Sequence, residues 1–218
     1  MTTFTSRPYL PEDARTYVRL AADAFSVARA GARPTESESF VAHIHSDANP
    51  AGRSIAALAE HEGRVMGHLS AIPFRFRRRE GGELICWQLG LFAVAAELQR
   101  GGLGGKLLRF LIAEVARERP GDCAYGYPNP RSLGLLLGWG LEPTAVVPAH
   151  VVPPRLRAGR LRDASGAWEL SELDAAGAAA ALARVRCCET ARGRFVRDAA
   201  FFRWRVLGAD AGLRYEFL

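Results

Sequence analysis

A glycine-rich segment in the middle of the chain has the composition of a phosphate-binding loop, and it directly precedes a stretch with helical periodicity. The first N–H groups of a helix have no intrahelical acceptor, and the helix dipole adds partial positive charge there. Glycine lets a diphosphate approach this backbone closely because no Cβ stands in the way. The segment therefore predicts a diphosphate site made by Gln99, Arg100, Gly101, Gly102, Leu103, Gly104 and Gly105.

Three phosphate-binding patterns can be compared with this segment. A Walker loop, GxxxxGK followed by Ser or Thr, fails because Arg100 occupies the outer glycine position and Leu107 follows the lysine. A dinucleotide fingerprint, GxGxxG, fails at its third glycine, which is again Leu107. The pattern Q/R-x-x-G-x-G/A fits without a gap at Gln99, Gly102 and Gly104. A plain strand-to-helix turn is the alternative interpretation.

A second motif follows one predicted strand later. The pattern N-x-x-[AS]-x-x-L-[YL]-x-x-x-G, followed by an apolar residue, is met by Asn129, Ser132, Leu135, Leu136, Gly140 and Leu141. Together with the glycine pattern and its flanks at residues 94–104, this motif resembles the GNAT superfamily of acyl-CoA N-acyltransferases. The resemblance covers about residues 4–152, and both motifs occur in the order that the family has.

The resemblance implies transfer of an acetyl or other acyl group from CoA to a primary amine by direct attack in a ternary complex. It implies acetyl-CoA, or another acyl-CoA, held by the glycine segment, by the backbone of Phe92, Ala93 and Val94, and by Asn129 and Ser132. N–H groups near residues 92–94 could also polarise the acyl carbonyl. The implied fold is α/β, with a mixed, mostly antiparallel twisted sheet flanked by helices. The expected acceptor is a small molecule or an amino sugar.

Two positions depart from the family's pattern. Leu136 stands where the family often has a tyrosine that protonates the leaving thiolate, and Gln88 stands near a frequent carboxylate or histidine. Neither side chain can transfer a proton. Positioning can supply much of the rate of such a reaction. Tyr127, at the end of a short predicted strand, is the first substitute candidate, followed by Glu83 and His68; a structural role is the alternative for each.

Periodicity predicts the elements that would position these residues. Strands are expected at residues 3–7, 54–60, 65–78, 83–95, 122–127, 142–152 and 213–218, and helices at residues 12–30, 36–46, 103–119, 130–137, 170–185 and 199–207. The strand at 83–95 is almost continuously apolar, as expected of a central strand covered on both faces.

The chain is expected to divide near residue 152. Residues 1–152 would form the acyltransferase domain, 153–168 a linker, and 169–218 a helical extension ending in a strand. Residues 197–205, with Tyr215, resemble the opening of a second GNAT-like half, as in large members of the superfamily thought to act on sugar amines. The chain would then be a truncated tandem protein. A helical cap on the first core, or a last strand completing the first sheet, are the alternatives.

Composition and charge limit the partners. Hydrophobic residues make up 49% and charged residues 24%, which favours a packed core. The net charge of +6 suits an anionic ligand. It comes almost wholly from arginine, since Lys106 is the only lysine, which is typical of a GC-rich bacterial genome. No apolar run is long enough for a membrane span and no signal-peptide layout is seen, so a cytoplasmic protein is expected. A homodimer is left open.

Metal binding is not expected. His43 and His45 form an HxH pattern, but residues i and i+2 point apart on a helix. The cysteines show neither zinc-type nor redox-type spacing and are expected to be reduced and mostly buried: Cys86, Cys123, Cys187 and Cys188.

Two other functions compete with acyl transfer. The missing tyrosine and base allow a module that binds or senses CoA without catalysis. The arginines within residues 75–79 allow a nucleic-acid binder, although the few aromatic residues interleaved with them disfavour it.

Overall fold

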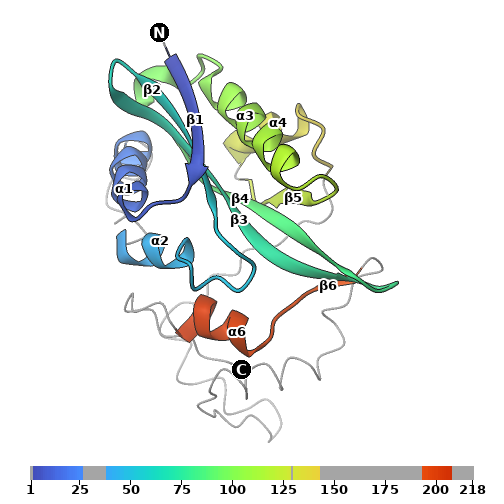
Figure 1. Ribbon diagram of the computed structural model, residues 1–218. Helices are drawn as coiled ribbons and strands as arrows, with labels where there is room; N and C mark the ends of the chain where they lie inside the picture. The colour runs from blue at the N-terminus through green and yellow to red at the C-terminus, as the bar shows by residue number, and fades with distance from the viewer. Residues whose placement is uncertain (1, 27–37, 129, 143–192, 208–218) are drawn as a thin grey trace, which may run out of the picture.

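The computed structural model describes residues 2–26, 38–128, 130–142 and 193–207 (Figure 1). The predicted strands at 142–152 and 213–218, the predicted helix at 170–185 and the predicted linker fall wholly or almost wholly outside these residues. The elements in chain order are β1 (Thr2–Pro8), α1 (Pro11–Ser26), α2 (Glu38–Ile44), β2 (Ile55–His61), β3 (Arg64–Arg78), β4 (Glu83–Val94), the 3-10 turn η1 (Ala96–Leu98), α3 (Leu103–Glu118), β5 (Cys123–Gly126), α4 (Pro130–Leu137), β6 (Gly193–Phe195), α6 (Ala199–Phe202) and the π-helical turn η4 (Arg203–Leu207).

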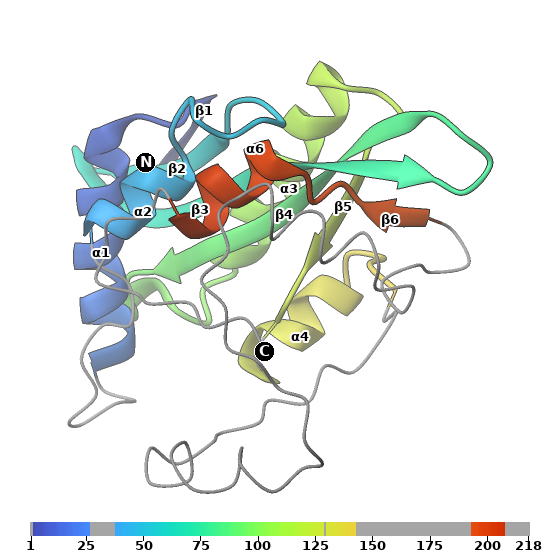
Figure 2. The same ribbon diagram turned by 90° about the horizontal axis from the view of Figure 1, so that it is seen from below.

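One twisted sheet forms the centre of the described structure. Its strand order is β1-β2-β3-β4-β5, and β6 pairs with β3. Strands β1 to β4 are antiparallel neighbours, whereas β4 and β5 run parallel. Helices α1 and α2 lie on one face of the sheet, and α3 and α4 lie on the other (Figures 1 and 2). The predicted fold class, a mixed and mostly antiparallel sheet flanked by helices, is therefore confirmed.

Helix α3 packs closely on the sheet through an apolar stripe that recurs at helical spacing. Its buried residues are Leu103, Leu107, Leu108, Leu111 and Val115. The approach is close because Gly67 of β3 lies beneath the helix: a Cβ on Gly67 would lie 3.3 Å from Leu107 and 3.2 Å from Ala59. This packing fixes where the N-terminus of α3 meets β4.

The start of α1 is tied to the end of β1 by one buried carboxylate. Asp13 is only 2% exposed, and its oxygens accept from the Arg7 guanidinium at 2.7 and 2.8 Å. One of these oxygens also accepts from the Leu10 backbone N–H at 2.8 Å, which satisfies a donor at the helix start. A buried charge is tolerated only when it is paired in this way.

The described C-terminal segment packs on this same sheet. Strand β6 lies beside the outer half of β3, with Phe195 opposite Phe76. Asp198 caps α6 by accepting from the Phe201 N–H at 3.0 Å, and it also pairs with Arg75 of β3. The described part of the extension therefore joins the same sheet, and the division near residue 152 and a second GNAT-like half stay predictions. Among the described residues, no helix has the length and hydropathy of a bilayer span.

Truncation of the α3 stripe should destabilise the fold. Leu111 is fully buried, so Leu111→Ala removes apolar contacts and leaves a cavity that lowers the free energy of unfolding by about 2–5 kcal/mol. Exposed Glu118, near the end of the same helix, is the control. Glu118→Ala should change the free energy of unfolding by less than about 0.5 kcal/mol. Urea unfolding measures both. Equal losses in the two variants would contradict the packing described here.

Candidate functional site

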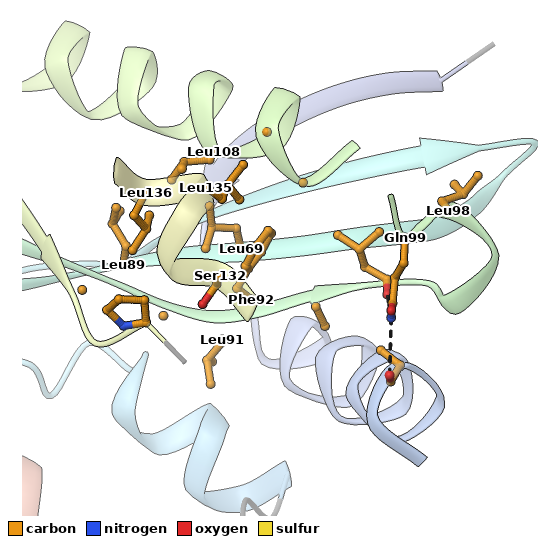
Figure 3. A pocket seen from close by; sticks show the side chains of 18 of the residues that line it. Leu69, Leu89, Leu91, Phe92, Leu98, Gln99, Leu108, Ser132, Leu135 and Leu136 are labelled. Atoms are coloured by element: carbon orange, nitrogen blue, oxygen red, sulfur yellow. Dashed lines mark hydrogen bonds between the residues drawn. The ribbon is translucent and has the colours of Figure 1, made fainter. Parts of the chain in front are cut away.

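A cavity of about 810 Å³ lies between the second half of β4, the N-terminus of α3, and α4 (Figure 3). In Figure 3, Leu108, Leu135 and Leu136 lie on the α3 side of β4, and Leu91 lies on the side of α1 and α2. The lining residues are Tyr17, Ala24, Leu69, Leu89, Gly90, Leu91, Phe92, Ala93, Val94, Leu98, Gln99, Arg100, Gly102, Gly104, Gly105, Leu108, Gly126, Tyr127, Pro128, Ser132, Leu135 and Leu136.

One wall of the cavity is an unpaired strand edge. Strand β5 pairs with β4 only as far as Leu89 opposite Gly126, whereas β4 continues to Val94. Within the described part of the chain, no strand lies beside residues 90–94 on this side. The N–H and C=O groups of such an edge can bind an extended ligand that contains amides, as they would bind a neighbouring strand.

A β-bulge in β4 lies at the same place. On one side of it Ser70 of β3 is opposite Gly90, and on the other side His68 is opposite Ala93. Two residues of β4 therefore face a single residue of β3, which bends the strand and increases its twist. Leu91, the first residue of the bulge, has φ of 50°, a conformation that non-glycine residues rarely adopt.

Two side chains of β3 hold the bulge by donating hydrogen bonds to its carbonyls. The Ser70 hydroxyl donates to the carbonyl of Gly90 at 3.0 Å. The His68 Nδ1–H donates to the carbonyl of Leu91 at 2.9 Å. Both carbonyls belong to the distorted stretch, so these hydrogen bonds offset the cost of the strained Leu91 conformation.

The environment of His68 decides its protonation state. Burial lowers its pKa to about 4, against a weaker opposing effect of the hydrogen bond to Leu91. Because a carbonyl only accepts, Nδ1 carries the hydrogen and Nε2 is unprotonated at neutral pH. A base with so low a pKa accepts protons poorly at pH 7. The geometry therefore favours the structural role for His68 over proton transfer.

The glycine segment, residues 99–105, joins η1 to α3 and borders the cavity. The first hydrogen bond of α3 runs from the Lys106 N–H to the Gly102 carbonyl at 3.2 Å. The amides of Leu103, Gly104 and Gly105 precede it and therefore have no acceptor within the helix. Gly102 precedes the helix with φ of 77°, which glycine adopts without strain.

Not every amide of this segment is available to a ligand. The N–H of Gln99 donates to the Ala96 carbonyl and the N–H of Gly101 donates to the Leu98 carbonyl, each at 3.3 Å. The diphosphate site was predicted from residues 99–105 as a whole, but these two amides are already paired, because the tight turn that leads into α3 uses them internally.

The side chains around this segment fix it to its neighbours. The Gln99 amide donates to the carbonyls of Val94 at 3.1 Å and Ala24 at 3.4 Å, which links the segment to β4 and α1 (Figure 3). A Cβ on Gly104 would lie only 2.8 Å from Cζ of Phe92. Gly104 is therefore needed where the helix start meets the Phe92 ring, in addition to any close approach by a ligand.

The structure places the predicted proton-transfer residues differently. Tyr127 lines the cavity, is 67% exposed, and contacts Tyr125 edge-on with ring centroids 5.8 Å apart. Glu83 begins β4 at the end away from the cavity and pairs with Arg77 at 2.7 Å. The structure does not bring Glu83 to the cavity, because the seven residues 84–90 of extended chain lie between it and Leu91.

The remaining predicted residues either line the cavity or lie outside the described part of the chain. Ser132 and Leu136 of α4 line the cavity, whereas Asn129 lies outside the described residues. Leu91 and Tyr17 line the cavity but were not among the predicted binding residues. Gly90 inside an apolar strand pattern is a signal that could have indicated the bulge. Nothing in the sequence indicates that Tyr17 reaches the cavity from α1.

Two further kinds of ligand, a metal ion and a nucleic acid, can be compared with the described residues. In the part of the chain that the structure describes, no three His, Cys, Asp or Glu side chains gather as metal ligands would. Two of the clustered arginines are in ion pairs, Arg75 with Asp198 and Arg77 with Glu83. These pairs reduce the positive charge that the cluster offers to a nucleic acid.

Comparison with known protein families identifies the family of this chain. Residues 17–139, more than half of the chain, match the profile of the acetyltransferase (GNAT) family. The chain belongs to the GNAT family. This membership supports acyl transfer in general and the use of an acyl-CoA. No curated protein matches this GNAT chain.

Solved structures similar to this chain are acetyltransferases. A predicted acetyltransferase with acetyl-CoA from Clostridium acetobutylicum superposes with a TM-score of 0.54 at 12% identity, covering 69% of this chain and 96% of that one. Glucosamine-6-phosphate N-acetyltransferase from Arabidopsis thaliana gives 0.49 at 14% identity, covering 69% and 99%. A GNAT family acetyltransferase from Brucella melitensis in complex with acetyl-CoA gives 0.46 at 22% identity, covering 65% and 84%.

Burial of His68 should make stability depend on pH. Its pKa is about 4 in the folded protein and 6.5 when exposed, so between these values the unfolded chain binds more protons. The free energy of unfolding should therefore fall as the pH drops from 6.5 to 4, by about 3 kcal/mol from this residue. Urea unfolding across this range should show a smaller fall in His68→Gln, and an unchanged fall in the control His61→Gln. Equal pH dependence in wild type and His68→Gln would contradict this account.

Proposed function

We propose that this GNAT protein transfers an acyl group, in the first instance acetyl, from CoA to the primary amine of a small molecule or amino sugar. One observation carries the proposal: the unpaired edge of β4 and the free amides at the start of α3 border the same cavity. The edge suits the amides of a pantetheine arm. The helix start suits a diphosphate.

The residues around the helix start fit the anionic part of CoA. Leu103, Gly104 and Gly105 offer backbone N–H groups without intrahelical acceptors. Arg100 lines the cavity, is exposed and carries a permanent positive charge. The apolar side chains of Leu135 and Leu136 suit the aliphatic portions of the arm. The bound thioester would supply the activated acyl group, and the C. acetobutylicum neighbour with acetyl-CoA supports this choice.

The bulge would orient the acyl group. By displacing Leu91 and Phe92 from regular pairing, it turns backbone toward the cavity, where an N–H could polarise the acyl carbonyl. The cavity lining contains no cysteine among the described residues, so direct attack by the amine is favoured over an acyl-enzyme. Holding the two reactants together would then supply much of the rate.

Proton transfer would fall to Tyr127. It is the titratable side chain on the β5 side of the cavity, where the sulfur would leave. The family's usual tyrosine position is Leu136, which also lines the cavity and lies close to Gly126 at the end of β5. Tyr127 would thus reach the leaving group from a neighbouring position.

The choice of acceptor rests on the resemblance of the C-terminal stretch to tandem members of the superfamily. We expect the acceptor to lie opposite the cofactor, near residues 26–40 and the predicted strand at 142–152, most of which lie outside the described residues.

A CoA-binding module without catalysis is the second candidate. Leu136 favours it, because an apolar side chain occupies the position from which the family often protonates the thiolate. Turnover of acetyl-CoA with a panel of small amines and amino sugars separates the two: binding without turnover supports the module, and amide formation supports the enzyme.

Replacement of Gly104 should weaken cofactor binding selectively. A new Cβ would push the Phe92 ring toward the cavity, so Gly104→Ala should raise the Kd for acetyl-CoA at least tenfold, or about 1.4 kcal/mol. Isothermal titration calorimetry measures this directly.

The matched control is Gly134→Ala in α4. Its Cβ would meet no atom within 4 Å, so this variant should keep the wild-type Kd, while thermal unfolding shows a gain of up to about 1 kcal/mol from helix propensity. No binding heat from the wild-type protein would end the acyl-CoA proposal.

Removal of the Tyr127 hydroxyl should slow turnover without affecting binding. Tyr127→Phe should lower kcat at least tenfold, since a general acid contributes about that much or more, and should leave KM for acetyl-CoA within about twofold. Adding Leu136→Tyr to this variant should restore part of the lost kcat. An unchanged kcat in Tyr127→Phe would assign the tyrosine to packing alone.

A further inference from the structure

Cys86 and Cys123 face each other across β4 and β5, outside the cavity. We propose that they are a peroxide-sensitive thiol pair, in which Cys123 reacts first and Cys86 then closes a disulfide with it. The inference does not depend on acyl transfer, because neither residue lines the cavity.

The register of the two strands brings the cysteines together. Cys86 is directly opposite Cys123 in the parallel pairing of β4 and β5. Neighbouring strands are about 4.8 Å apart, within the Cα separation of about 4.4–6.8 Å that disulfides span. Paired residues of adjacent strands project from the same face of the sheet, and each thiol is the main influence on the pKa of the other.

Asp122 holds this arrangement in place. One of its carboxylate oxygens accepts from the Ile85 backbone N–H at 3.2 Å, and the other accepts from the Trp87 indole at 3.1 Å. Both partners lie on β4, on either side of Cys86. The residue before Cys123 is therefore anchored to the residues that flank Cys86, which fixes the sulfur pair.

The two thiols differ in access and in acidity. Cys86 is buried and Cys123 is exposed, which corrects the expectation of mostly buried cysteines for Cys123. The hydrogen bond from Cys86 lowers the pKa of Cys123 to about 7, with a smaller favourable effect of Arg78, against burial and Asp122. The same hydrogen bond, together with burial, raises the pKa of Cys86. At neutral pH the exposed sulfur therefore has substantial thiolate character, and the buried one stays a thiol.

This asymmetry matches the two steps of disulfide formation by hydrogen peroxide. The Cys123 thiolate attacks one peroxide oxygen; an S–O bond forms, the O–O bond breaks, and the leaving hydroxide takes a proton to become water. Cys86 then attacks the Cys123 sulfenic sulfur. An S–S bond forms, the S–O bond breaks, and the released hydroxide takes the Cys86 proton as a second water. The two sulfurs together lose two electrons, which reduce the peroxide.

The test follows the cross-link in the full chain. Cys187 and Cys188, which lie outside the described residues, are first replaced by serine to remove competing thiols. The protein is treated with one equivalent of hydrogen peroxide at pH 7, blocked with iodoacetamide, and digested with trypsin. Arg100 and Arg117 lie between the two cysteines, so they fall in different peptides. Mass spectrometry should show these peptides joined, and dithiothreitol should separate them.

Single variants assign the two roles. In Cys86→Ala, dimedone should trap a sulfenic acid on Cys123, and iodoacetamide should label Cys123 several-fold more slowly at pH 7 because alanine cannot donate a hydrogen bond to the Cys123 sulfur. In Cys123→Ser, the buried Cys86 should resist both reagents.

The proposal is overturned if the protein with both cysteines gives no linked peptide, or if Cys123 is labelled at the rate of an ordinary exposed thiol. This first measurement needs no change at residue 86 or 123, so it holds even if a single variant fails to fold. Circular dichroism confirms the fold of each variant.

Discussion

Two hydrogen bonds from β3 to consecutive carbonyls of β4 determine the shape of the site. Ser70 donates to Gly90 and His68 donates to Leu91, and together they hold a bulge that places Leu91 in a strained conformation. The bulge lies just beyond Leu89, the last residue of β4 that pairs with β5. A bulge bends and twists a strand, so β4 can stay paired with β3 while its other edge leaves β5. The open edge, and hence the cavity, depends on this local distortion.

The other half of the site is aligned with that edge by packing. Gly67 lets α3 lie close to the sheet, and Gly104 lets the start of α3 meet the Phe92 ring. Gln99 ties the intervening segment to the end of β4 and to α1. Together these contacts position the free amides of α3 beside the strand edge. The cavity is lined by few titratable groups, as expected if the proposed acyl transfer is accelerated mainly by positioning.

Much of this could be predicted from local patterns. The glycine pattern ending at Gly104 and the apolar stripe of α3 mark a strand, a tight turn and a helix within a short stretch of chain, and all three are present. Prediction was weaker where long-range pairing decides the outcome. Glu83 shares a strand with the cavity wall but lies at its far end, paired with Arg77. Cys123 lies on the short strand β5, at the edge of the described sheet, and its side chain is exposed.

The sequence by itself determined the family, the order of the elements and the location of the helix start, because these depend on residue types at fixed short spacings. Only the tertiary structure decided which amides stay free, since Gln99 and Gly101 donate within the turn. It also decided that His68 holds the bulge, and that Cys86 meets Cys123. Each of these depends on register and burial between residues far apart in the chain, and a one-residue change of register would turn every side chain of a strand to the opposite face.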